Sequence, residues 1–343
     1  MNSRPLSIRG TGLVTPVGLT AAASCCAFRV KINDPFETRF IDSSGAWIMA
    51  HQVNLDRPYS GLTKLAKMAA LAIEEALQDF NRDQWHRLPL LLCVAEVERP
   101  GRLAGLDDQL LVQIQSELGV SFAKSSAVVP YGRVGVAMAL AQARTLLGKT
   151  KLPGVLIVST DSLLSWPTLS HYEREDRLLT EANSNGFMPG EGAGALWVGV
   201  AERGTTQLLC TGIGFGQEPA HIDSGEPLRA EGLTQAIKAS LDDAGRQLHD
   251  MDYRITDNSG EQYYFKEASL ALSRTLRQRK EAFDIWHPAE CTGESGATSG
   301  VAVIATANEA CRKGYSPGPN ILTHWANDAG QRAAVTLEFR GTA

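Results

Sequence analysis

The chain has 343 residues, of which 43% are hydrophobic and 21% charged, and its formal net charge is -5. A globular protein with a sizeable core has this composition, and the length predicts either two domains or two halves of one large core. The small negative charge and the lack of any block of like charges argue against nucleic acid and anionic membranes as partners.

Six cysteines are scattered through the sequence without the spacing of a metal site, and Cys93 and Cys210 lie inside apolar runs. We expect free, mostly buried thiols in a reducing compartment, and neither a metal nor another cofactor. No run reaches the roughly 18 apolar residues of a membrane span, and the N-terminus does not have the pattern of a secretory leader. The sequence therefore predicts a soluble cytoplasmic protein.

Strand and helix patterns alternate through the first half of the chain. Residues 6–18 predict a strand that breaks into a Gly/Pro loop, and a helix should follow over 19–29. Residues 30–57 are irregular. Further helices are expected from about 62 to 80, 107 to 118 and 132 to 147, and buried strands over 88–96, 128–129 and 154–162. The charged run 173–177 suggests a solvated helix face.

Four glycines and a proline crowd the next segment, which contains Gly186, Phe187, Gly190, Glu191 and Gly192. Such a density of glycine predicts a tight, buried loop that leads into the apolar strand 195–200. Neither the dinucleotide-binding spacing nor the lysine of a phosphate-binding loop is present, so nucleotide binding is not expected.

The second half repeats the alternation. A strand over 208–212 should run into a glycine loop at 214–216, and a helix over 232–245 follows. Short strands are expected at 254–256 and 283–288, a helix over 301–311 and a closing strand over 333–339. We predict a division into residues 1–204 and 205–343.

Two motifs resemble those of the β-ketoacyl synthases. The loop from Gly186 to Ala193 is similar to their Gly-Phe-x-x-Gly-Glu-Gly-Ala loop, and Gly12, Thr15, Pro16 and Gly18 match the signature of their first strand and loop. The resemblance implies the thiolase-like fold, a duplicated α/β architecture with five αβαβα layers. It also implies a dimer, either with a second copy or with a sister chain.

The family's catalytic residues are a cysteine at a turn between a strand and a helix, and two histidines. Carried onto this chain, the resemblance places Tyr131, Asn258 and Glu294 at these positions, and no cysteine lies between Cys93 and Cys210. Tyrosine, with a pKa near ~10, is a weak acyl acceptor, and a glutamate would repel an enolate. We therefore expect no catalytic residue of the family type.

A remnant of the family's pocket is expected around the replaced positions. The residues predicted to line it are Gly132, Ser259, His287, Cys291, His324 and Asn327. Packing is favoured over catalysis for Cys291 and for the two histidines. Glu261 and Glu294 could face each other across the pocket, with structural hydrogen bonding as the preferred interpretation.

Three functions are compatible with these replacements. The first is a non-catalytic accessory or adaptor that binds a protein partner, because degenerate relatives of this kind resemble the thiolase-like proteins of type VI secretion effector loci. The second is an acyltransferase, or a chain-length-factor-like partner of a ketoacyl synthase that handles acyl-carrier protein or acyl-coenzyme A. The third is an enzyme with new chemistry at Tyr131, Glu294 and the two histidines.

Overall fold

Ten strands form one sheet in the computed structural model, which describes residues 4–341. Their order is β10-β9-β11-β12-β8-β1-β7-β6-β4-β5. The strands of the first half are β1 (Leu6–Val14), β4 (Leu90–Cys93), β5 (Ala127–Val129), β6 (Val155–Ser162) and β7 (Glu191–Val200). Those of the second half are β8 (Gln207–Gln217), β9 (Tyr253–Thr256), β10 (Ile285–Trp286), β11 (Asn320–Ala326) and β12 (Gln331–Arg340).

The two halves of this sheet have the same pattern. In the first, β5, β4 and β6 are parallel and β7 and β1 follow antiparallel; in the second, β10, β9 and β11 are parallel and β12 and β8 follow antiparallel. Among residues 4–341, the halves of the sheet join where Leu6, Ser7 and Ile8 of β1 pair with β8. The predicted division at residue 204 falls in the connection between β7 and β8. Whether each half folds separately stays a prediction.

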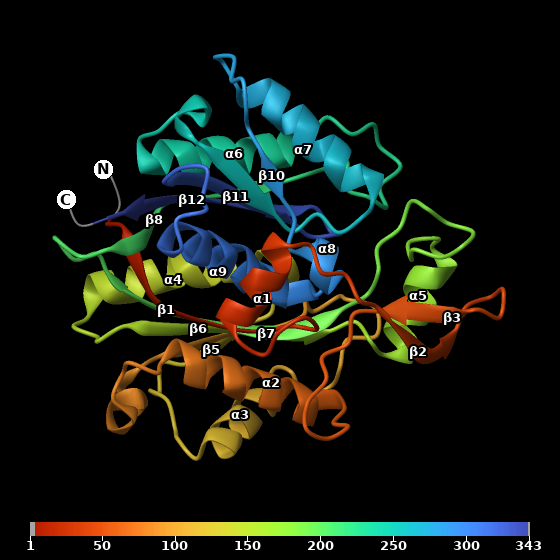
Figure 1. The fold of residues 1–343 in the computed structure, drawn as a ribbon, viewed down its shortest axis with the longest axis horizontal. Coiled ribbons are helices and arrows are strands. Elements are labelled where there is room, and N and C mark those ends of the chain that lie inside the picture. Colours follow the sequence, from red (N-terminus) through yellow and green to blue (C-terminus); the bar gives the residue numbers. More distant parts are fainter. Residues whose placement is uncertain (1–3, 342–343) are drawn as a thin grey trace.

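Helices cover both faces of the folded sheet and fill the space between its halves, and one of them, α5 (Trp166–Arg174), lies to one side beside the hairpin over residues 36–50 (Figure 1). They are α1 (Ala21–Arg29), α2 (Gly61–Ala76), α3 (Leu110–Leu118), α4 (Gly135–Lys149), α5 (Trp166–Arg174), α6 (Glu231–Ala244), α7 (Gln262–Thr275), α8 (Ala289–Thr292) and α9 (Ser299–Arg312). Figure 1 shows α4 and α9 between the two halves of the sheet, α2 and α3 on one outer face, and α6 and α7 on the other. The predicted five-layer αβαβα fold is confirmed.

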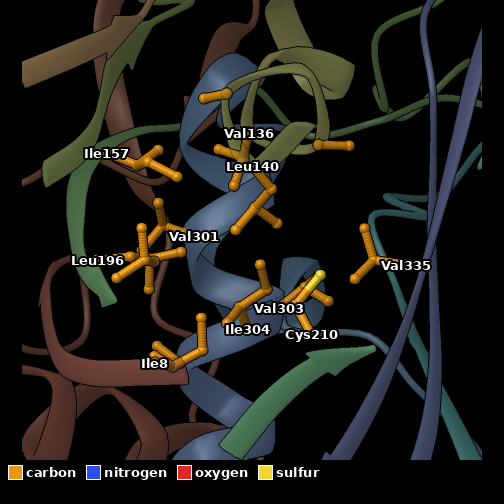
Figure 2. Close-up of a cluster of buried hydrophobic side chains, with 14 of the residues drawn as sticks. Ile8, Val136, Leu140, Ile157, Leu196, Cys210, Val301, Val303, Ile304 and Val335 are labelled. Atoms are coloured by element: carbon orange, nitrogen blue, oxygen red, sulfur yellow. The ribbon is translucent and has the colours of Figure 1, made fainter. Parts of the chain in front are cut away.

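The largest apolar cluster fills the space around the two central helices. Val136 and Leu140 of α4 and Val301 of α9 pack against Ile157 and Leu196 of the first half of the sheet (Figure 2). Nearly every residue of α9 is buried, as expected of a helix enclosed between the two halves of the sheet. The turns that start α4 and α9 are thereby fixed at the centre of the molecule.

The outer helices approach the sheet so closely that only glycine fits beneath them. A Cβ at Gly12 of β1 would lie 2.0 Å from the carbonyl oxygen of Ala72 in α2, and one at Gly214 of β8 would lie 2.1 Å from that of Ala236 in α6. The prediction of a loop at 214–216 is wrong, because these glycines belong to β8 and permit close packing rather than a turn.

The segment 30–57, expected to be irregular, contains a small hairpin. Its strands are β2 (Phe36–Ile41) and β3 (Trp47–Ala50), which pair only with each other. Within residues 4–341, no helix has the length and apolar character needed to cross a bilayer.

Candidate functional site

Two turns with the same backbone conformation meet near the centre of the fold. The first follows β5 and leads through a 3-10 turn (Gly132–Val134) into α4, and the second leads through Gly296–Thr298 into α9. Tyr131 (φ -121, ψ 19) corresponds to Ser295 (φ -107, ψ 18), and Gly132 (φ 51) corresponds to Gly296 (φ 56). Since a positive φ strains most side chains, glycine is required at the second position of both turns.

A carboxylate occupies the space beside each of these glycines. A Cβ at Gly132 would lie 2.1 Å from Glu96 Oε2, and one at Gly296 would lie 2.1 Å from Asp161 Oδ2. Tyr131 does not project into this space, since its side chain is 43% exposed and its carbonyl oxygen accepts a hydrogen bond of 2.9 Å from Asn327 Nδ2. The interior side of the first turn therefore carries no side chain.

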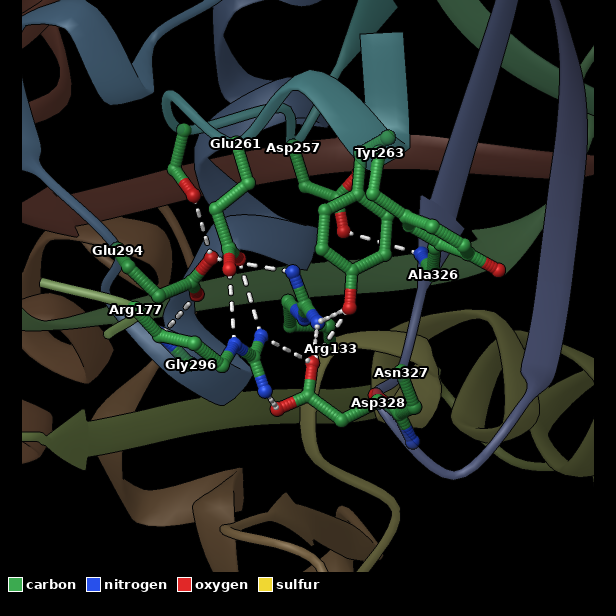
Figure 3. A network of polar contacts seen from close by, with 12 residues as sticks. Arg133, Arg177, Asp257, Glu261, Tyr263, Glu294, Gly296, Ala326, Asn327 and Asp328 are labelled. Atoms are coloured by element: carbon green, nitrogen blue, oxygen red, sulfur yellow. Dashed lines mark hydrogen bonds and ion pairs between the residues drawn. The ribbon is translucent and has the colours of Figure 1, made fainter. Parts of the chain in front are cut away.

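Asp328 lies at the centre of a buried polar network (Figure 3). Its carboxylate accepts hydrogen bonds from Arg133 at 2.5 Å, from Arg177 at 2.8 and 3.1 Å, and from Tyr264 at 2.5 Å. The hydroxyl group of Tyr172 donates to Asp328 Oδ2 at 3.2 Å. The positive charge of Arg133 and then Arg177, together with these hydrogen bonds, outweighs burial and holds the pKa of Asp328 well below its usual range.

Glu261 and Glu294 each contact an arginine of this network. Arg177 donates to both oxygens of Glu261, at 2.8 and 2.9 Å, and Arg133 donates to Glu294 at 3.2 Å. Ser259 Oγ and the backbone amide of Gly296 also donate to Glu294, both at 2.9 Å. The two glutamates therefore belong to one hydrogen-bonded cluster, in agreement with the preferred structural interpretation.

The prediction that residues 173–177 form a solvated face is wrong for Arg177. Its side chain is only 9% exposed and pairs with Glu261 and Asp328. Glu261 precedes α7 and Asp328 follows β11, so the arginine connects segments that are far apart in the sequence. A pattern read along one helix could not show these partners.

A second ion-pair cluster supports the other side of the turns. Arg99 pairs with Glu96 at 2.9 Å and with Asp161 at 2.8 Å. Asp161 also accepts a hydrogen bond of 2.9 Å from the amide of Ala297, at the start of α9. Burial raises the pKa of Asp161, although Arg99 opposes this shift.

Asp257 is a buried carboxyl group whose pKa lies near neutral pH. Burial raises its pKa to about 7, with Arg133 opposing the shift and Glu294 adding to it. Its Oδ2 accepts a hydrogen bond of 3.1 Å from the amide of Ala326 (Figure 3). A carboxyl group at this point is thus partly protonated at neutral pH.

Little space is left between the side chains of the two ion-pair clusters, around Asp328 and around Arg99. The void that they enclose has a volume of about 10 Å³, which is room for at most one water molecule. Its charged lining consists of four carboxyl and three guanidinium groups: Glu96, Glu261, Glu294 and Asp328, with Arg99, Arg133 and Arg177. An acyl chain does not fit there.

The glycine loop identified in the sequence holds one side of this site. Gly190 donates its amide to the carbonyl oxygen of Glu294, and Glu294 donates its amide to Met188, both at 2.8 Å. A Cβ at Gly190 would lie 2.0 Å from the carbonyl oxygen of Thr292, so the contact requires glycine. Glu191 begins β7 and forms a buried ion pair with Lys64.

Known proteins resemble this chain in structure, whereas comparisons of its sequence find no match. No protein-family model and no curated protein matches. Among solved structures, the ishigamide ketosynthase/chain length factor has a TM-score of 0.79 at 16% identity over 99% of this chain and 100% of that chain. A β-ketoacyl synthase from Burkholderia phymatum has a TM-score of 0.75 at 14% identity, over 98% and 100%.

A third similar structure is a ketosynthase in complex with its chain length factor, from Xenorhabdus doucetiae. Its TM-score is 0.77 at 10% identity, and the match covers 98% of both chains. The chain has the ketosynthase fold. At these identities the likeness establishes the fold and leaves the activity open.

The predicted site residues of this ketosynthase fold lie in two groups. Gly132, Ser259, Glu294 and Asn327 belong to the network around the void, and Asn258 is buried, with its backbone amide donating to Thr256 Oγ1. His287, Cys291 and His324 do not line the void. His287 Nδ1 lies 3.1 Å from Thr256 Oγ1, and Cys291 Sγ lies near the carbonyl oxygen of Ala27 in α1.

The two histidines are poorly placed to be charged. Burial lowers the pKa of His324 to about 3 and also lowers the pKa of His287. Burial raises the pKa of the Cys291 thiol to about 11, which disfavours the reactive thiolate. Among the described residues, no group of three or more His, Cys, Asp or Glu is arranged to hold a metal ion.

Proposed function

We propose that this chain is a non-catalytic subunit that pairs with a sister chain of the ketosynthase fold, as a chain-length-factor-like partner. The proposal depends on one observation, the ion-pair network that fills the space between the two central turns and leaves about 10 Å³. The resemblance to ketoacyl synthases places the nucleophile and its two histidines in this space. A thioester substrate could not reach them there.

The chemistry of the filled site also argues against acyl transfer. In the turn before α4, the carboxylate of Glu96 lies against Gly132, next to Tyr131, the residue that the resemblance places at the nucleophile position. A tetrahedral oxyanion or an enolate needs hydrogen-bond donors and positive charge. The guanidinium groups of Arg133 and Arg177 are instead paired with Glu294, Glu261 and Asp328.

A partner of the same fold is supported by the solved structures, one of which is a ketosynthase in complex with its chain length factor. We place this pairing at β5, which lies at one edge of the sheet. This strand pairs with β4 on one side, and no described strand lies on its other side. An open edge can accept a strand from another chain.

Co-expression with the ketosynthase-like chains of the same genome tests the pairing. We expect a stable 1:1 complex by size-exclusion chromatography with light scattering. Val128→Lys, in the half-buried middle of β5, should weaken it by about tenfold or more, because an interface core excludes an unpaired charge. Ile285→Lys in β10, at the opposite edge of the sheet, is the matched control. A chain that associates with no ketosynthase-like chain contradicts the proposal.

Intact-protein mass spectrometry after incubation with acyl-coenzyme A and acyl-carrier-protein thioesters tests the missing activity. We expect no covalent adduct. A stable acyl group mapped to Tyr131, Cys291 or any other side chain would restore the acyltransferase hypothesis. This measurement is independent of the pairing experiment, since a non-catalytic chain could still fail to find a partner.

The sequence also predicts a second role, an adaptor that loads a type VI secretion effector. The two roles require different protein partners, so affinity capture from the native host distinguishes them. Capture of a sister chain supports the proposed function, and capture of an effector supports the adaptor. For either role we propose a cytoplasmic location, which the six free cysteines support.

A further inference from the structure

We propose that a second cavity, separate from the filled central site, binds a small carboxylate with an apolar body. The cavity has a volume of about 300 Å³, at the lower end of the range for ligand pockets. It lies between α1, the segment from β10 to α8, and α9, which are neighbours in Figure 1. It has no lining residue in common with the central void.

The walls of this cavity are mainly apolar. Phe28 of α1, Ile285 and Trp286 of β10, Pro288 and Tyr315 supply its surface. Trp286 packs against Tyr253, with ring centroids 4.6 Å apart, and stacks on Tyr315 at 6.3 Å. These contacts hold the aromatic walls in place, so the cavity is largely preformed. The body of the ligand is therefore an aliphatic or aromatic group.

A cation at the mouth selects the charge of the ligand. Arg29, in the last turn of α1, lies over the Tyr315 ring at 4.6 Å, and no carboxylate within residues 4–341 pairs with it. The neighbouring Lys31 is already paired with Glu290 at 3.1 Å. Arg29 thus supplies the unpaired positive charge, and its planar guanidinium group suits a carboxylate.

His287 adds one hydrogen-bonding position to the wall. Its Nδ1 is taken by Thr256 Oγ1 at 3.1 Å, so Nε2 is the ring nitrogen left for a ligand. The cavity therefore combines apolar walls, one free cation and one neutral imidazole. Pockets with a few polar groups in an apolar lining bind small molecules in a defined orientation.

Isothermal titration calorimetry with 3-phenylpropionate and octanoate tests the site, with 3-phenylpropionamide as the neutral counterpart. We expect saturable binding of the carboxylates and about tenfold weaker binding of the amide. Arg29→Gln should weaken carboxylate binding by about tenfold and leave the amide unaffected. Arg312→Gln is the matched control, since Arg312 also lies in the last turn of a helix but outside this cavity.

Photocrosslinking with a benzophenone carboxylate locates the bound molecule. We expect labelled peptides that contain residues 25–31, 285–290 or 315. Three outcomes would each overturn the proposal: labelling elsewhere, unchanged carboxylate affinity in Arg29→Gln, or no saturable binding at millimolar concentrations. Each variant's thermal melting would first show that it is folded. None of these results depends on the pairing proposed above.

Discussion

Gly132 faces the carboxylate of Glu96 so closely that a Cβ on the glycine would lie 2.1 Å from Oε2. Glu96 cannot move away freely, because Arg99 donates to both of its oxygens, at 3.2 and 2.9 Å. The carboxylate of Glu96, held in place by Arg99, therefore fills the interior side of the turn. A single substitution at Gly132 cannot return a nucleophile to a working position.

We predict that Gly132→Ala destabilises the protein by about 1–3 kcal/mol, from the positive φ and from the contact with Glu96. Gly132→Ala should cost less in a Glu96→Ala background, because the contact is then absent and only the backbone strain is left. Urea unfolding of the two single variants and the double variant measures the coupling. Effects that add within about 0.5 kcal/mol would show that the contact is unimportant.

Asp328 neutralises two buried arginines, so its loss should be costly. Asp328→Asn leaves Arg133 and Arg177 with excess positive charge, and we expect a loss of about 3–5 kcal/mol in the free energy of unfolding. Asp107→Asn is the control, because Asp107 pairs with Arg102 but its side chain is 56% exposed, and it should cost less than about 1 kcal/mol. Similar losses in the two variants would contradict this prediction.

The same carboxylate should contribute to stability at acid pH. The folded pKa of Asp328 is below the ordinary value, so its contribution is present above the ordinary pKa of Asp and is lost as the pH falls toward the folded pKa. Asp328→Asn should therefore lose less stability than the natural protein between pH 5 and pH 3. Equal acid slopes, measured by urea unfolding at each pH, would argue against a paired carboxylate.

Asp257 should have the opposite dependence on pH. Burial raises its folded pKa to about 7, so between the ordinary pKa of Asp and pH 7 the folded chain holds a proton that the unfolded chain has lost. The natural protein therefore loses stability as the pH rises through this range. Asp257→Asn keeps an acceptor for the Ala326 amide. Between pH 5 and pH 8, the free energy of unfolding of this variant should rise by about 2 kcal/mol relative to that of the natural protein. A difference that does not change with pH would refute the assignment.

The layers and most elements were predictable because they depend on local patterns. Apolar runs identified the strands β6 and β7. Glycine density identified the loop at residues 186–190, where Gly186 and Gly190 are required by contact with Leu178 and Thr292, but the predicted loop was too long, because residues 191–194 already belong to β7. The glycines of β8 were wrongly predicted to form a loop. They allow α6 to pack closely on the strand, and a local sequence pattern does not show that contact. A glycine in a strand and a glycine in a turn look alike until the packing is known.

The chemistry of the central site was only partly predictable. The motifs located Asn258, Glu294 and the turn at Gly132, but they did not show that the pocket is filled. Arg133, Arg177 and Asp328 pair over more than 150 positions of sequence, and such pairs leave no periodic signal. The one available hint was charge, since Arg133 follows a predicted strand and turn, and a charged group there is costly to bury unpaired.

The close approach of α6 to β8 gives a test of the packing itself. Gly214→Ala would bring a Cβ within 2.1 Å of the Ala236 carbonyl oxygen, a backbone atom that cannot move unless the helix moves. We therefore expect the free energy of unfolding to fall by about 3 kcal/mol or more, the size seen for severe changes in a core. Gly148→Ala is the matched change in an open position, near the end of α4, where no atom lies within 4 Å of the new Cβ. Because alanine favours helix over glycine, that variant should gain up to about 1 kcal/mol. Thermal and urea unfolding should move in opposite directions for the two variants; if Gly214→Ala is neutral, the helix is not as close to the strand as the structure places it.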